Sequence, residues 1–454
     1  MSGIWQIIGE QIVHFSNWIW GMPLFLLLIG GGLYFLVYSE FVPFRYYLRA
    51  LRSFKAKDMD APGQISSFEA LASAIAATVG MGNISGVAVA LTMGGPGAIF
   101  WMWVSAVVGM ATKFFEGSLT IMYKGKDSAG VFQGGPMWMI TEGLGKKWRP
   151  MAVFFSVFGL IGTLCLMQAN QLTEAIITVF TIPMGIENSF GLRFGIGVII
   201  CVIVAAVVLG GIERISKVAA KLVPAMVAFY IALVAYIVLT NLEVIPSVFA
   251  SIFQGAFEFK SGMGGLAGSA IVIGARRAAF VNEAGVGTAS MMHGASKNKE
   301  PIREGLVAMI APSIDSGLVC TLTALGILIN GQYRVTEIQG IEMAMNSFQA
   351  SIPGMGHYLL MVMVFCFAFS TMFSYSYYGV KCTNFLFGAR YAEYYNYFFL
   401  AMLVFGAVIS LEEVVGIIDS AYALMSIPTM ITLLVLSPKV KREMKQYLAR
   451  FQQP

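Results

Sequence analysis

The chain has 454 residues, of which 57% are hydrophobic and only 12% are charged, with a net charge of +5. Soluble domains carry about 25% charged residues, and a soluble core of this length could not bury so much apolar surface. The composition therefore excludes a soluble enzyme, a secreted disulfide scaffold and a disordered chain, and it predicts a polytopic helical membrane protein.

Eleven apolar runs are long enough to cross a bilayer, which takes about 20 residues per helix. In chain order they lie near 18–38, 67–93, 97–123, 151–180, 192–210, 216–240, 268–296, 304–330, 357–388, 395–412 and 414–437. We name the first the extra helix and the others spans one to ten. The prediction is a single all-α domain over 1–454 with about 11 transmembrane helices. It comprises the extra helix, five spans over 67–240, five spans over 268–437 and a tail over 438–454.

Lysine and arginine gather in alternate loops, such as those at 45–57 and 124–149, whereas the other loops hold only Arg193, Lys260 and Arg334. Cationic loops face the cytoplasm. This pattern predicts a multi-pass protein of the cytoplasmic membrane with its N-terminus outside and its C-terminus inside. We expect the cytoplasmic loop 124–150 to lie in the membrane interface, and the external loop 241–267 to be either a lid or a plain connector.

Span one has glycines where a membrane helix should be continuous. Gly80, Gly82 and Asn83 lie at the middle of FEALASAIAATVGMGNISGVAVALTMGG. Glycine costs about 1 kcal/mol in a helix interior, so the helix is predicted to open here and to expose N–H and C=O groups. Those groups suit a carboxylate and a small cation respectively. The alternative is a face of small residues that lets helices pack closely.

Span three carries two amides, Gln168 and Asn170, at its middle. An amide offers both donors and acceptors, which suits a zwitterionic ligand. The alternative is a hydrogen bond that joins neighbouring helices.

Span six contains Asn282, Glu283, Gly285 and Gly287 within ARRAAFVNEAGVGTAS. Polar groups at this depth are expensive and indicate a functional site. We expect a second helix break here, across which Glu283 and Arg277 neutralise each other. The alternative is a turn at the inner membrane surface.

Each of the two breaks opens a set of five spans. Because five is odd, the second set is inverted relative to the first. Paired interrupted helices in inverted halves predict a transporter site at the membrane midplane.

Spans seven and eight add three polar residues. Asp315 lies roughly 16 Å into span seven, at 1.5 Å per residue, where a carboxylate needs either a cation beside span one or a structural hydrogen bond. Ser370 and Thr371 lie at the middle of span eight. Hydroxyl and carbonyl oxygens are ligands of hard cations, although a lone hydroxyl often bonds its own helix backbone.

Several of these segments together resemble one family. GGPGAIFWMWVSAVVG, TVGMGNISGVA, GGPMWMI, MQAN, FVNEAGVGTA, IDSGLVCTLTAL and FAFSTMFSYSYYGVKC are similar to blocks of the alanine or glycine:cation symporter family, also called the sodium:alanine symporters. The resemblance covers nearly the whole chain. It implies the leucine-transporter fold, with an inverted five-helix repeat and one extra N-terminal helix. It also implies uptake of small neutral amino acids coupled to Na+.

The resemblance also implies positions for the site. In span one, Gly80, Gly82 and Asn83 would hold the substrate carboxylate. In span six, the carbonyls of Ala279, Phe280, Val281 and Asn282 would hold its ammonium. The span-three amides of Gln168 and Asn170 would make a further contact. A sodium site would lie between spans one and eight, at Ala76, Val79, Ala368 and Thr371. Asp315 is a candidate second cation contact.

The chain departs from the family pattern at four places. Met81 stands where the family has Thr, Val281 where it has Ser, Val380 where it has Glu, and Ser374-Tyr375 where it has Gly-Trp. Tyr375 is expected to bound the pocket for the substrate side chain, and the alternative is that it only packs span eight on span three. A different residue here affects which small amino acids are accepted.

Three other functions remain open at this point. A proton-coupled transporter, or one for another solute, would use Asp315, Glu283 and Glu174 as proton carriers. A membrane enzyme or redox subunit would need a metal or haem site, which three scattered histidines and five cysteines without a CxxC do not favour. A channel would show flux without saturation.

Overall fold

The computed structural model describes residues 11–12, 14–53, 61–257, 270–331, 333 and 340–450. The expected basic residues Lys55, Lys57, Lys260 and Arg334 lie outside the described residues. So do 258–267 of the second long loop, the first two residues of span six and residues 451–454 of the tail. Within the described ranges the chain is almost entirely helical, with one short hairpin.

The first part of the chain forms the extra helix and spans one and two. The extra helix runs as α2 (Met22–Phe25), η1 (Leu26–Gly30) and α3 (Gly31–Tyr38), followed by α4 (Val42–Arg45) and α5 (Tyr47–Ser53). Span one is divided into α6 (Ser67–Thr78), η2 (Gly82–Gly86) and α7 (Val87–Gly94), and span two is α8 (Gly97–Met122). A capping box fixes the start of α6: the Glu69 amide donates to Ser66 Oγ, and the Ser66 amide donates to the Glu69 carboxylate at 2.8 Å.

A hairpin of β1 (Gly125–Lys126) and β2 (Phe132–Gln133) follows α8. The loop continues through α9 (Pro136–Trp138), η3 (Met139–Leu144) and η4 (Lys146–Trp148) into span three. Span three consists of α10 (Arg149–Gly162), α11 (Leu166–Ile176), η5 (Ile177–Thr181) and η6 (Ile182–Met184). Spans four and five are α12 (Phe190–Val208) and α13 (Gly211–Leu239), and α14 (Ile245–Gly255) follows them.

The second half repeats the pattern of a broken first helix. Span six is α15 (Ala270–Asn282) and α16 (Thr288–His293); span seven is α17 (Pro301–Ala308), η8 (Ser313–Val319) and α18 (Cys320–Leu328). After α19 (Gly340–Ser351), span eight is α20 (Gly356–Phe387). α21 (Ala389–Ala392) leads into span nine, α22 (Tyr394–Val408), and span ten is α23 (Leu411–Ala449). Most of the predicted tail therefore continues this last helix.

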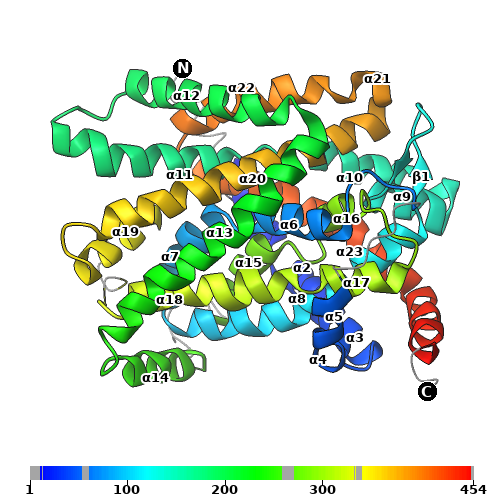
Figure 1. Ribbon diagram of the computed structural model, residues 1–454, viewed down its shortest axis with the longest axis horizontal. Coiled ribbons are helices and arrows are strands. Elements are labelled where there is room, and N and C mark those ends of the chain that lie inside the picture. The colour runs from blue at the N-terminus through cyan, green and yellow to red at the C-terminus, as the bar shows by residue number, and fades with distance from the viewer. Residues whose placement is uncertain are drawn as a thin grey trace.

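Seven helices of the described part are long and apolar enough to cross a membrane, or eight if the bent pair in span one counts as one. The extra helix, span six and span nine form shorter helices. Figure 1 shows α14 and α19 at one end of the bundle, on the left, and β1 and α9 at the other. We call these the α19 end and the hairpin end. Among the long apolar helices, α8 and α20 have the largest share of buried residues, whereas most residues of α12 and α13 are not buried.

Candidate functional site

Span one opens between α6 and η2, where the sequence predicts a break. The two halves, Ser67–Thr78 and Gly82–Gly94, are bent by 52° relative to each other. The Gly80 amide donates to Asn83 Oδ1 at 2.9 Å. In a continuous helix this amide would instead bond the carbonyl of Ala76. The break therefore releases the Ala76 carbonyl from the helical hydrogen-bond pattern.

Span eight supplies a hydroxyl to this released carbonyl. Thr371 Oγ1 donates to the Ala76 carbonyl at 3.1 Å. A Cβ added at Gly80 would overlap Thr371 Oγ1, so glycine is what allows α20 to come this close. Ala76, Thr371 and their neighbours Val79 and Ala368 are fully buried. Two of the residues assigned to a sodium site are thus in contact, and their oxygens are of the kind that hard cations bind.

Span six opens over 283–287, between α15 and α16. Glu283, Gly285 and Gly287 have positive φ angles of 53°, 85° and 98°, which a continuing right-handed helix cannot contain. Asn282 and Glu283 are each 1% exposed. The break therefore lies inside the bundle, and its depth in the membrane stays a prediction.

Three main-chain carbonyls at the end of α15 lose their helical partners. In a continuous helix the amides at 284–286 would bond the carbonyls of 280–282. They donate instead to the Asn282 and Glu116 side chains and to the Glu283 carbonyl. The three carbonyls can thus accept hydrogen bonds from another molecule, and an ammonium group is a donor of the required kind.

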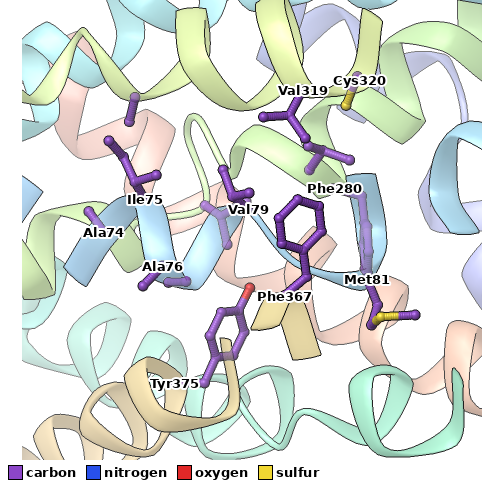
Figure 2. Packing of buried hydrophobic residues seen from close by; sticks show 14 of the residues in the cluster. Ala74, Ile75, Ala76, Val79, Met81, Phe280, Val319, Cys320, Phe367 and Tyr375 are labelled. Atoms are coloured by element: carbon purple, nitrogen blue, oxygen red, sulfur yellow. The ribbon is translucent and has the colours of Figure 1, made fainter. Parts of the chain in front are cut away.

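The two breaks lie against each other. A Cβ added at Gly82 would be 3.3 Å from the Phe280 ring and 3.5 Å from the Val281 side chain. Figure 2 shows the Tyr375 hydroxyl pointing from α20 toward Val79 of the first break. Spans one, six and eight therefore meet at one buried place.

Tyr375 is tied to the second break by its hydroxyl. That hydroxyl contacts the Glu283 carboxylate and the hydroxyl of Tyr422 on α23. The hydroxyls of Thr288 and Tyr422 also donate to the Glu283 carboxylate. Tyr375 thus lies at the breaks with its hydroxyl bonded to protein groups. Its role in bounding a pocket stays a prediction.

The span-three amides are not brought to the breaks in the same way. Asn170 Nδ2 donates to the carbonyls of Gly406 and Ile409, at 3.3 and 2.7 Å, so this amide faces the end of α22. Asn170 lines a cavity of about 450 Å³ at the α19 end. Gln168 is buried in α11 at 7% exposure. In this structure Asn170 therefore makes a hydrogen bond between neighbouring helices, which was the alternative expectation for the span-three amides.

Span three also has a break that the sequence did not reveal. α10 ends at Gly162 and α11 begins at Leu166, with Cys165 between them at a φ of 52°. Thr163 stabilises the break, because its hydroxyl bonds the Gly159 carbonyl and the Tyr395 hydroxyl. A left-handed cysteine is uncommon, and no sequence signal marks it in advance.

Buried charges surround the two breaks. Lys113 and Glu116 of α8, Glu283 and Asp315 are each at most 1% exposed. The Lys113 ammonium interacts electrostatically with all three carboxylates, although its Nζ has no hydrogen-bond partner in the described part of the chain. Asn83 Nδ2 donates to the Asp315 carbonyl at 3.2 Å, which places Asp315 beside the span-one break. A lysine and a glutamate within an apolar helix were the signal for this cluster.

The sequence predicts that Arg277 pairs with Glu283, and this prediction is wrong. Arg277 pairs instead with Asp419 of α23. Arg277 Nη2 lies 3.0 Å from Asp419 Oδ2, and Arg276 Nη2 lies 2.7 Å from the same oxygen. Trp20 Nε1 donates to the Asp419 carbonyl at 2.8 Å. Both arginines therefore join α15 to α23, and Arg276 also donates to Asn17 Oδ1 and Ser16 Oγ in the segment before α2. Glu283 is left to its hydroxyl donors.

At the hairpin end, chain segments next to the two broken helices are held together. The Gln64 amide, before α6, donates to the Ala295 carbonyl, after α16, at 2.7 Å. Lys124 Nζ donates to the carbonyls of Pro62 and Ser296, each at 2.7 Å. Burial lowers the pKa of Lys124 to about 8, because the charged form loses hydration. One lysine thus joins the chain segments that lead into the first break and out of the second.

Known transport proteins are similar to this chain over nearly its whole length. The sodium:alanine symporter family matches residues 5–454 of the chain. The chain is 37% identical over 442 residues to the sodium/alanine symporter AgcS of Methanococcus maripaludis, covering 95% of both chains. It is 33% identical over 453 residues to the probable sodium/glutamine symporter GlnT of Bacillus subtilis, covering 97% of this chain and 91% of that one.

A solved structure shares the fold. The structure of MhsT in complex with L-phenylalanine is similar with a TM-score of 0.61 at 13% identity, covering 83% of this chain and 89% of that one. A likeness at this identity concerns the fold alone. Together with the family match over the whole chain, it shows a transporter and not an enzyme. The chain belongs to the sodium:alanine symporter family.

Proposed function

We propose that this protein is a sodium-coupled symporter that imports small neutral amino acids, of the alanine and glycine class, by alternating access. It would work in the cytoplasmic membrane through eleven membrane helices, ten of them forming two inverted sets of five at 67–240 and 268–437. With the N-terminus outside and the C-terminus inside, the hairpin end faces the cytoplasm.

One observation carries the proposal: two broken helices meet, and each leaves main-chain carbonyls without their helical partners. The carbonyls at 280–282, together with Ala279, suit the substrate ammonium. The half-helix that begins at Gly82, with Gly80 and Asn83, presents its positive end to the substrate carboxylate. Gln168 and Asn170 of span three would contact the substrate only after a change of conformation.

The coupling ion would sit between spans one and eight. The Ala76 carbonyl and the Thr371 hydroxyl, which already lie 3.1 Å apart, would be two of its ligands. Val79 and Ala368 would add carbonyl oxygens, and Asp315 would favour the ion from beside the first break. A shell of such oxygens can replace the hydration of a hard cation.

Uptake into proteoliposomes tests this function. The purified protein is reconstituted, and entry of labelled glycine, alanine, serine and leucine is measured with an inward sodium gradient and with choline in its place. We expect saturable uptake of the small amino acids only with sodium. Uptake that is equally fast in choline would contradict sodium coupling.

A second candidate, proton coupling, is favoured by the buried carboxylates of Glu116, Glu283 and Asp315. Its signature would be uptake driven by an inward pH gradient without sodium. The same proteoliposomes, loaded at a higher internal pH in choline buffer, separate the two coupling ions.

A further inference from the structure

A second polar cavity lies away from the breaks, at the hairpin end. It has a volume of about 220 Å³ and lies between the hairpin, the end of α20, the start of α13 and the segment α21–α22. Its polar walls include Asp127, Gln133, Lys381, Asn384, Glu393 and Asn396. Pockets for drug-sized ligands begin at about 300 Å³, so this one suits a molecule of only a few heavy atoms.

The positive group of this cavity is Lys381. Its side chain is 4% exposed, its Nζ contacts the side-chain oxygen of Gln133, and it lies 4.7 Å from the centre of the Tyr377 ring. None of the ion pairs between described residues includes Lys381. Asp127, in the same wall, interacts with Lys381 electrostatically but forms no direct ion pair with it. A buried ammonium without a carboxylate in direct contact is costly, so a bound anion at this position would be favourable.

The free acceptors of the cavity are two amide oxygens. Asn384 Nδ2 donates to Asp127 Oδ2 at 3.0 Å, and Asn396 Nδ2 donates to Glu393 Oε2 at 2.8 Å. Because a carboxylate accepts only donors, these bonds fix which end of each amide is its oxygen. Both oxygens are buried and accept no hydrogen bond from the described residues, and Asn396 is only 3% exposed. Each therefore needs an N–H or O–H donor.

We propose that this cavity binds a free amino acid, with its carboxylate on Lys381 and its ammonium on the oxygens of Asn384 and Asn396. An inorganic anion would satisfy Lys381 but leave the amide oxygens unpaired between two carboxylates. A metal cation would satisfy the oxygens but meet the Lys381 ammonium. A zwitterion matches both halves of the site.

The position of the cavity suggests that it binds the substrate after the substrate leaves the breaks. This inference rests on the proposed function. Lys381 lies six residues after Tyr375 on α20, which is about 9 Å along the helix. Gln64, just before α6, forms part of the wall, and its side-chain oxygen accepts a hydrogen bond from the Tyr377 hydroxyl at 3.2 Å. An amino acid that leaves the breaks when α6 moves would reach this cavity next, on the side predicted to be cytoplasmic.

Binding with and without sodium distinguishes the two sites. No sodium ligand is assigned to the cavity, so we expect wild-type protein in choline buffer to bind labelled L-alanine weakly by equilibrium dialysis. Lys381→Met, which keeps the length of the side chain and removes its charge, should weaken this sodium-independent binding at least tenfold. Asn396→Leu should weaken it as well. Sodium-dependent binding by each variant shows that it is folded.

The matched control is Lys439→Met, because Lys439 is an exposed lysine at the same end of the bundle and outside the cavity. It should leave sodium-independent binding unchanged. Equal binding by wild type and Lys381→Met, or no sodium-independent binding by wild type, would overturn the proposal. Equal loss in Lys439→Met would also overturn it, since the effect would then be one of surface charge. Sodium-driven uptake by wild type decides the proposed function separately.

Discussion

The two broken helices are stabilised by different chemistry. The span-one break is held by a neutral amide, since Asn83 accepts from the Gly80 amide and donates to the Asp315 carbonyl. The span-six break is held by acids, since Glu116 accepts from the Gly285 amide at 2.6 Å and Glu283 accepts from hydroxyl groups. The first break thus leaves a carbonyl beside a hydroxyl, the two groups proposed as sodium ligands. The second adds negative charge beside the carbonyls proposed for an ammonium.

This difference suggests that the two breaks have different functions, one in ion coupling and the other in the stability of the fold. The first break is bridged by an uncharged side chain and has the Asp315 carboxylate beside it, whereas the second break hydrogen-bonds the buried carboxylates of Glu116 and Glu283 directly. Substitutions in the acidic break should therefore affect folding, and substitutions in the neutral break should affect ion coupling.

The largest effect is expected from Glu116→Leu. The change removes the acceptor of the Gly285 amide and one of the carboxylates that balance the buried Lys113. Breaking a direct buried ion pair costs about 3–5 kcal/mol. Losing an electrostatic partner of Lys113 together with the acceptor of the Gly285 amide should have a comparable cost, so little folded protein should accumulate. Size-exclusion profiles of the detergent-solubilised protein measure this. Glu412→Leu, at an exposed glutamate of α23, is the control and should behave as wild type.

Gly80→Ala should abolish transport while the protein still folds. The added methyl group would overlap Thr371 Oγ1 and push α6 and α20 apart. A displacement of about 1 Å at a site can cost about 100-fold in rate. Gly86→Ala adds the same group to the same span, with only the Val281 side chain 3.9 Å away. Equal sodium-driven uptake by the two variants would show that the close approach at Gly80 is not needed.

Tyr375→Phe should destabilise the span-six break less than Glu116→Leu does. The ring stays, but Glu283 loses one of its hydroxyl donors. A hydrogen bond to a charged group contributes about 1.5–3 kcal/mol, and thermal unfolding in detergent should register a loss in that range. If competition by a series from glycine to leucine is unchanged in this variant, the hydroxyl has no part in selectivity. Tyr375→Trp, with a larger ring, should then disfavour the larger substrates through size alone.

A pH-dependent effect is expected from Lys124, which joins the halves of the two broken helices that lie at the hairpin end. Burial lowers the pKa of Lys124 to about 8 in the folded protein, whereas an unperturbed lysine has a pKa of 10.5. Between pH 8 and pH 10.5, Lys124 is therefore protonated in the unfolded chain and deprotonated in the folded protein. The free energy of unfolding should therefore rise with pH in this window, by up to about 1.4 kcal/mol per pH unit, relative to Lys124→Met. Thermal unfolding of both proteins from pH 7 to 10 measures the difference. A constant difference would mean that Lys124 has an ordinary pKa.

The sequence was sufficient to predict both breaks, because glycine and polar residues are costly within an apolar span unless a break or a site accommodates them. It did not predict partners that are distant in the chain. Asp419 lies 142 residues from Arg277, so nothing local favours it over Glu283. Asn170 faces α22 from α11, which follows a break at 163–165 whose three residues include neither glycine nor proline. Such facts are decided by tertiary packing, and only the structure supplies them.

The most direct test of the account is the sodium dependence of uptake by Thr371→Val, with Thr371→Ser as the control that keeps the hydroxyl. Initial rates of alanine entry into proteoliposomes are measured over a range of sodium concentrations. We predict that the valine variant folds, transports at high sodium, and has an apparent sodium affinity lower by about tenfold, equal to about 1.4 kcal/mol. The serine variant should stay close to wild type. An unchanged sodium affinity in Thr371→Val would contradict a sodium site between spans one and eight.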